Sequence, residues 1–139
     1  MRRSASRLVA VFCLGVAALW LSSEGAGAQP RKLAAPHMEL EPEEHDFGSV
    51  AQDTELVYEF NVKNTGSEDL MIRRISTSCG CTAAVTSDRV VPPGGATLLR
   101  VTLQTRKRTG VLQKSISVAS NDPRHVTTVR VKAFVEPPE

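Results

Sequence analysis

The sequence has few aromatic residues and few cysteines, and both shortages limit how the chain can fold. Aromatic residues make up 4% of its 139 residues, with one Trp, one Tyr and four Phe. A core made from this composition must therefore consist mainly of Val, Leu and Ile. The three cysteines are too few for a small scaffold held together by several disulfides.

Long apolar runs are also lacking, apart from one near the N-terminus that extends from Leu8 to Leu21. Three arginines precede this run, and the small residues Ala26-Gly27-Ala28 follow it. This order is typical of a secretory signal peptide, which we predict for residues 1–28. The run is shorter than the ~20 residues that a membrane-spanning helix needs. We therefore expect no stable membrane span after cleavage, and an uncleaved N-terminal anchor is the alternative.

Removal of residues 1–28 also removes the excess of positive charge. The whole chain has a formal net charge of +2, and the removed segment holds three Arg and one Glu, so Lys+Arg falls from 17 to 14 and Asp+Glu from 15 to 14. A neutral chain has no long-range attraction for nucleic acid or for an anionic membrane. The one dense basic run, Arg106-Lys107-Arg108, is typical of a solvated turn. We expect no nucleic-acid partner.

Export would deliver the chain to the periplasm or the extracellular space, where disulfides persist. Only Cys79 and Cys81 remain after residue 28. These two residues are neighbours in the sequence, so they cannot join distant parts of the fold. The hydrophobic core must hold the domain together.

The remaining chain divides into a linker and a patterned region. Residues 29–42 contain three prolines and show no apolar periodicity, and we interpret them as a flexible tether. In residues 43–136, apolar and polar residues alternate over short segments, which is the pattern of half-buried strands. Examples are the sets Tyr58, Phe60, Val62 and Leu99, Val101, Leu103.

Turn-forming residues separate these segments, as at Asn64 to Gly66, Pro92 to Gly95 and Asn121 to Pro123. Ile75 falls out of step with the alternation across Arg73-Arg74, which indicates a β-bulge. No segment after the signal peptide has the apolar period of a helix. The pattern predicts an all-β fold, an immunoglobulin-like antiparallel β-sandwich of about seven strands.

Three segments resemble a known family: HDFGSV at residues 45–50, FNVKNTGSEDLMIRRISTSCGCT at residues 60–82 and SISVASNDP at residues 115–123. They are similar to the exported bacterial family called domain of unknown function 1573. That family looks like a relative of the Hydin-type (ASH) and PapD-like immunoglobulin folds. The resemblance covers about residues 43 to 135. It implies a fold and an export route but supplies no activity.

The motif SCGCT leaves three interpretations of Cys79 and Cys81 open. On a regular strand their Cα atoms would lie about 6.5–7 Å apart, at or beyond the upper limit for a disulfide. A disulfide therefore needs a bend, which Gly80 can supply through backbone angles that other residues avoid. So small a loop would stabilise the fold by only roughly 1.6 kcal/mol before strain is subtracted. The alternatives are simple packing, a redox-active disulfide and a metal site.

A metal site would use the Cys79 and Cys81 thiolates, which suit Cu(I), so copper is the alternative to having no cofactor. His37, His45 and His125 have no ligand spacing relative to the pair. The sequence also lacks a nucleophile elbow and a glycine-rich phosphate loop. It therefore predicts a protein that is not an enzyme.

Taken together, these features predict an exported, non-enzymatic module that binds or supports a protein of the cell envelope. The edge strands of a sandwich can pair with an extended segment of a partner. The alternative is a small thiol-redox or copper-handling protein that uses Cys79 and Cys81.

Overall fold

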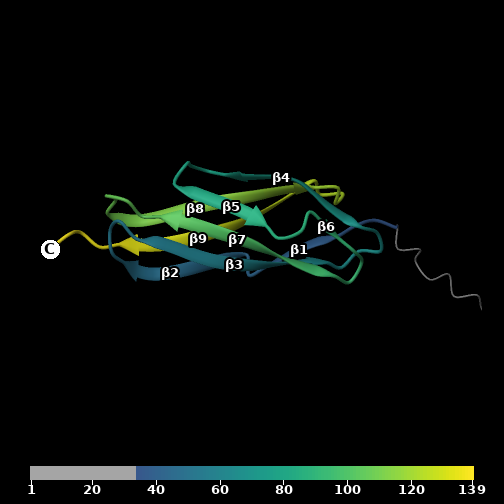
Figure 1. The fold of residues 1–139 in the computed structure, drawn as a ribbon, viewed down its shortest axis with the longest axis horizontal. Coiled ribbons are helices and arrows are strands. Elements are labelled where there is room, and N and C mark those ends of the chain that lie inside the picture. Colours follow the sequence, from purple (N-terminus) through teal and green to yellow (C-terminus); the bar gives the residue numbers. More distant parts are fainter. Residues whose placement is uncertain (1–33) are drawn as a thin grey trace, which may run out of the picture. The chain divides into compact units, whose positions relative to one another are not determined.

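The computed structural model of the protein describes residues 34–139, so the expected signal peptide at residues 1–28 lies outside the described residues. The described residues fold into two β-sheets that pack face to face (Figure 1). We find no helix in residues 34–139 that is long and apolar enough to cross a membrane.

The two sheets contain nine strands. The first sheet has the spatial order β1 (Met38–Glu41), β3 (Glu55–Asn64), β7 (Ala96–Gln104) and β5 (Thr82–Thr86). The second has the order β2 (Glu44–Val50), β9 (Val126–Val135), β8 (Gly110–Ser120), β4 (Leu70–Thr77) and β6 (Val90–Val91). Neighbouring strands are antiparallel except β2 and β9, which are parallel. The predicted immunoglobulin-like sandwich is confirmed, with nine strands where about seven were expected.

One additional strand, β1, lies in the segment that the sequence suggested was a tether. The interpretation of residues 29–42 as a flexible tether is wrong at its C-terminal end, because residues 38–41 pair with β3. Met38 is fully buried and Leu40 is 5% exposed, so both belong to the core. Two apolar residues are too few to reveal a strand by periodicity, and Pro42 beside them suggested a linker. The domain thus begins before residue 43.

The core lies between the sheets and has the composition that the sequence predicted. Its largest fully buried side chains are mostly aliphatic, with Phe60 as the one aromatic residue among them. They are Phe60, Met38, Leu70, Leu99, Leu103, Ile116, Val62, Val91, Val101, Val118, Val129 and Val131. Because these residues come from both sheets, burial of aliphatic surface holds the sandwich together.

The bulge expected in β4 is present. The register of β4 against β8 shifts between Ile72 and Arg74. The consecutive residues Arg73 and Arg74 lie at this shift, and both are exposed. The bulge therefore sets the direction of two basic side chains at the edge of the second sheet.

Strand β4 is only partly covered by its neighbour β6. The two residues of β6 pair with Leu70 and Met71, and the Arg89 carbonyl just before β6 accepts the Ile72 N–H. Beyond them, residues 73–77 of β4 have β8 on one side and, within residues 34–139, no strand on the other. The second sheet thus has a vacant place next to β4.

Candidate functional site: an open sheet edge and a disulfide turn

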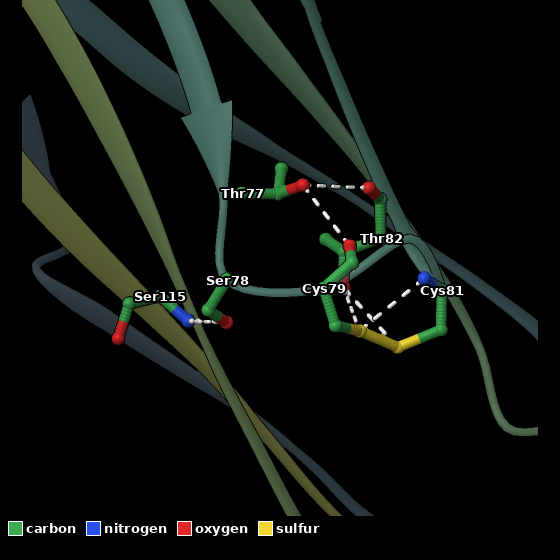
Figure 2. Close-up of a disulfide and its surroundings, with 6 residues drawn as sticks. All are labelled: Thr77, Ser78, Cys79, Cys81, Thr82 and Ser115. Carbon is green, nitrogen blue, oxygen red and sulfur yellow. Dashed lines mark hydrogen bonds between the residues drawn. A yellow bond between two sulfur atoms is a disulfide. The ribbon is translucent and has the colours of Figure 1, made fainter.

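Cys79 and Cys81 form a disulfide in the turn that joins β4 to β5 (Figure 2). The bond length is 2.06 Å and the Cα atoms lie 5.4 Å apart. Residues 78–81 leave the regular strand conformation, so the chain bends as a disulfide at this spacing requires.

The conformation of Gly80 differs from the sequence-based expectation. Among residues 34–139, the glycines with a positive φ are Gly48, Gly94 and Gly110, and Gly80 is not one of them. A Cβ atom added to Gly80 would meet no other atom within 4 Å. The expectation that the bend depends on the conformational freedom of glycine is therefore wrong.

Hydrogen bonds hold the turn in place of a special glycine conformation. The Thr82 N–H donates to the Cys79 carbonyl at 3.3 Å, and the Cys81 N–H donates to the Cys79 Sγ at 3.2 Å. The Thr77 hydroxyl lies 3.1 Å from the Cys79 carbonyl oxygen and 3.0 Å from that of Thr82 (Figure 2). The backbone groups of Thr82 are thus used within the turn.

The two cysteine residues differ in exposure. Cys81 is 5% exposed and is part of the core cluster, whereas Cys79 is half-buried and packs against that cluster. The Thr82 Oγ1 lies 3.9 Å from the Cys79 sulfur and 3.8 Å from the Cys81 sulfur. Cys79 is therefore the more accessible residue of the pair.

The histidines considered as further ligands lie in other contacts. The His45 ring stacks on Tyr58 with 3.6 Å between centroids, and the His37 Nδ1 lies 3.6 Å from the Asp122 Oδ2. His125 adopts a positive φ of 65° in the turn before β9. No group of three or more His, Cys, Asp or Glu side chains among the described residues is arranged to hold a metal ion.

The open edge of β4 presents backbone groups that point away from the sheet. The Ser78 N–H donates to the Ser115 carbonyl, and the Ser115 N–H donates to the Ser78 hydroxyl. The N–H and C=O groups of successive residues point to opposite edges of an antiparallel strand. The backbone groups of Ser76 therefore also point toward β8, whereas those of Ile75 and Thr77 point outward. Their N–H and C=O groups have no strand partner in the part of the chain that the structure describes.

Strand β5 forms a second open edge, in the other sheet. The Gln104 N–H donates to the Cys81 carbonyl and the Ser87 N–H to the Leu98 carbonyl, so odd-numbered residues of this segment face β7. By the same alternation, the backbone N–H and C=O groups of Ala84 and Thr86 point outward, away from β7. The disulfide turn therefore connects two open edges, one from each sheet.

The corresponding edge at β1 is closed by side chains. The Met38 N–H, which points away from β3, donates to the Asp122 Oδ2 at 2.6 Å. The Arg124 guanidinium donates to the Met38 carbonyl and lies 3.0 Å from the same carboxylate oxygen. Asp122 and Arg124 thus occupy the outward backbone groups of Met38, which a neighbouring strand would use. The sequence suggested only a turn at Asn121 to Pro123, and the SNDP motif was the available signal for a further role.

The closing pair is ionised over the physiological pH range. Burial alone raises the pKa of Asp122, but hydrogen bonds from the Arg124 side chain and from the backbone N–H groups of Met38 and Arg124 outweigh it and lower the pKa to about 2. The hydrogen bond to Asp122 raises the pKa of Arg124 in turn. The residues that bind the outward backbone groups of Met38 in β1 are therefore a charged pair, Asp122 and Arg124.

The edge formed by β2 is irregular. Its pairing with β9 is interrupted by a register shift between Asp46 and Ser49. The Asp46 carboxylate accepts the Gly48 N–H at 2.8 Å, and this hydrogen bond lowers the pKa of Asp46. Bulges of this kind make an edge a poor template for another strand.

The fold defines a class of immunoglobulin-like domains that includes solved structures of unrelated proteins. The chain is similar to the ASH/PapD-like domain of human CEP192 (PapD-like domain 7), with a TM-score of 0.61 and 11% identity over 100% of each chain. It is also similar to the VesB protease of Vibrio cholerae, with a TM-score of 0.57 and 8% identity over 71% of this chain and 31% of that chain. At these identities the similarity shows the fold alone.

The family can be stated more closely. A crystal structure of a protein of unknown function from Porphyromonas gingivalis W83 has a TM-score of 0.64 and 25% identity over 73% of this chain and 48% of that chain. The chain thus spans about half the length of that protein. No curated protein matches the chain. The family described as "Protein of unknown function (DUF1573)" matches residues 38–135, and the chain belongs to this family.

Proposed function

We propose that this protein is an exported, non-enzymatic module that binds a protein of the cell envelope by pairing the open edge of β4 with an extended segment of that partner. The observation that carries the proposal is the vacant place beside residues 73–77 of β4. There the outward backbone groups of Ile75 and Thr77 have the spacing that strand addition uses. Export is supported by the signal-peptide pattern of residues 1–28.

The side chains along this edge favour an approaching strand. Ser76 and Ser78 are small and exposed, so they do not block it. Proteins usually protect open edges because such edges promote aggregation. Here the β1 edge is protected at Met38 by Asp122 and Arg124, whereas the backbone groups of Ile75 and Thr77 have no partner strand among residues 34–139.

Amide hydrogen exchange tests the proposal directly. In the free protein, we expect the amides of Ile75 and Thr77 to exchange quickly and those of Ser76 and Ser78, which face β8, to exchange slowly. An extended peptide selected for binding to the purified protein should protect Ile75 and Thr77. Tight binding that leaves both amides unprotected would contradict pairing at this edge.

A second test modifies the backbone of the same peptide. N-methylation removes a hydrogen-bond donor, and only every second residue of a bound strand directs its N–H toward β4. Methylation on alternate residues in one register should therefore abolish binding, and methylation in the other register should leave most of it. Equal losses in both registers would argue against a strand-like bound conformation.

The disulfide supports a second candidate function, in thiol exchange, because Cys79 is only partly buried. A dithiol reductant would attack the Cys79 Sγ, form a mixed disulfide and release Cys81 as a thiol. The second thiol of the reductant would then displace Cys79. The pair gains two electrons and two protons, and the dithiol leaves as a disulfide.

Titration of free thiols in defined thiol–disulfide buffers tests this function, and Cu(I) added to the reduced protein tests copper handling. Reversible opening in the folded protein would support thiol exchange. Tight 1:1 copper binding that is lost in Cys79→Ser would support metal handling. Cysteines that react only after unfolding would contradict both.

A further inference from the structure

Three arginines lie at the open edge of β4, two on β4 itself and one directly before β6, and we call them the arginine edge: Arg73, Arg74 and Arg89. Arg73 and Arg74 are adjacent at the bulge, and all three residues are exposed. The Ile72 N–H donates to the Arg89 carbonyl at 2.8 Å, and the Arg89 Nη1 donates to the Arg73 carbonyl at 3.3 Å. The three residues therefore come together where β6 approaches β4, at one end of the vacant place.

None of the three arginines forms an ion pair with a carboxylate among residues 34–139. The ion pairs in this part of the chain involve His37, Lys63, Arg100, Arg124 and Lys132, and none involves the three arginines. Like charges held close together repel one another. An anionic ligand would relieve this repulsion.

The cluster does not reflect a general excess of positive charge. Without residues 1–28 the chain has 14 Lys+Arg and 14 Asp+Glu, the same subtraction as above, so it is formally neutral. A concentration of one sign on a neutral molecule creates a local field that selects its partner. The field here lies beside the backbone groups that accept a strand.

We propose that the segment that pairs with β4 is acidic and that its carboxylates bind the arginine edge. This inference rests on the proposed function, because it names the chemistry of the partner at that same edge. Arginine is suited to the role, since its planar guanidinium forms two parallel hydrogen bonds with a carboxylate.

The geometry of the sheet indicates which positions of the segment carry the charge. A strand that continues the line of β6 passes Arg73 first and then Ile75 and Thr77. Arg74 has Ala119 of β8 as its neighbour on one side. On the other side, its neighbour would be the residue of the added strand that lies directly opposite Arg74. An Asp or Glu at that position of the added strand would form a favourable cross-strand pair with Arg74.

The first experiment compares three labelled peptides of equal length, in which valine alternates with glutamate, threonine or lysine. Fluorescence anisotropy measures their binding to the purified protein. We expect the glutamate peptide to bind at least tenfold more tightly than the threonine peptide and the lysine peptide to bind weakest. The preference for glutamate should shrink as salt is raised, because the arginines are exposed.

The second experiment removes the charge with a matched control. The variant R73Q/R74Q/R89Q should lose at least tenfold in affinity for the glutamate peptide and little for the threonine peptide. The control R106Q/K107Q/R108Q removes the same charge from the exposed turn between β7 and β8 and should keep the affinity. Thermal unfolding verifies that both variants are folded.

The outcomes separate this inference from the proposed function. If all three peptides bind equally and protect the Ile75 and Thr77 amides, strand pairing stands and the acidic partner is overturned. If the glutamate peptide binds without protecting these amides, the proposed function fails. A protein that dimerises without peptide in sedimentation equilibrium, and loses the dimer in R73Q/R74Q/R89Q, would assign the edge to a second copy and overturn the acidic partner.

Discussion

Asp122 is a buried charged residue that joins two distant segments of the chain. Its carboxylate is 1% exposed and binds the backbone N–H of Met38, which lies 84 positions earlier in the chain. Sequence patterns could assign Asn121 to Pro123 to a turn because turn chemistry is local. The contact with Met38 could not be predicted, since it joins two segments that only the folded chain brings together.

We predict that Asp122→Asn destabilises the protein and changes its response to acid. Loss of the charged partner of Met38 and Arg124 should cost about 1–3 kcal/mol at pH 7. The pKa of Asp122 is lowered from 3.8 to about 2 on folding, so its contribution is present above pH 4 and is lost as the pH falls toward 2. Urea unfolding measures both effects.

The control is Asp69→Asn, because Asp69 is exposed and precedes β4. The difference in unfolding free energy between the wild type and Asp122→Asn should narrow between about pH 4 and pH 2, since the wild-type carboxylate is protonated there. A difference that stays constant over this range would show that the ion pair is not its source.

A second residue-scale prediction concerns Cys79 and Cys81. Joint replacement by alanine should cost well under the 2–5 kcal/mol typical of disulfides in small secreted domains, because the closed loop is very short. Phe60→Ala should cost about 3–5 kcal/mol, because Phe60 is fully buried between the sheets. Denaturant unfolding ranks the two, and a double-alanine variant that does not fold would reverse the ranking.

At the scale of elements, the alternation of apolar residues predicted the long strands and the bulge of β4. It missed β1 and β6 because four and two residues carry too little periodicity. It also could not indicate that β2 runs parallel to β9, since the residues of β2 mark a strand but not its neighbour. The open edge of β4 depends on the shortness of β6, so it too required the structure.

Two glycines provide a prediction at this scale. A Cβ atom on Gly66 would meet the Ala35 carbonyl oxygen and lie 2.5 Å from the His37 nitrogen, because the segment before β1 crosses the Asn64 to Gly66 turn. Gly66→Ala should displace that segment and destabilise the protein well beyond the ±0.5 kcal/mol of ordinary surface substitutions.

Gly80→Ala is the matched control, since its Cβ atom meets nothing within 4 Å and its φ is not positive. It should change the unfolding free energy by no more than about 0.5 kcal/mol and leave the disulfide able to form. Thiol titration and thermal unfolding test this. A large loss of stability in Gly80→Ala would restore the conformational role that the sequence suggested.

For the whole molecule, we predict export with cleavage after Ala28. Trp20 is the only tryptophan in the chain and precedes that position. Protein purified from the native cell envelope should therefore begin near Gln29 and show no tryptophan fluorescence. Intact mass and emission spectra test this, and a mature protein that retains Trp20 would contradict cleavage at this position.

The closure of the β1 edge at Met38 by Asp122 and Arg124 limits where another strand can be added. A sandwich that could add strands on both sides would be divalent, and divalent units join into chains of any length. With β1 sealed at Met38 and β2 interrupted, the edges left open among residues 34–139 are β4 and β5, which the disulfide turn joins. We expect strand addition to be confined to these two edges, so a partner that covers both would leave no open edge from which a fibre could grow.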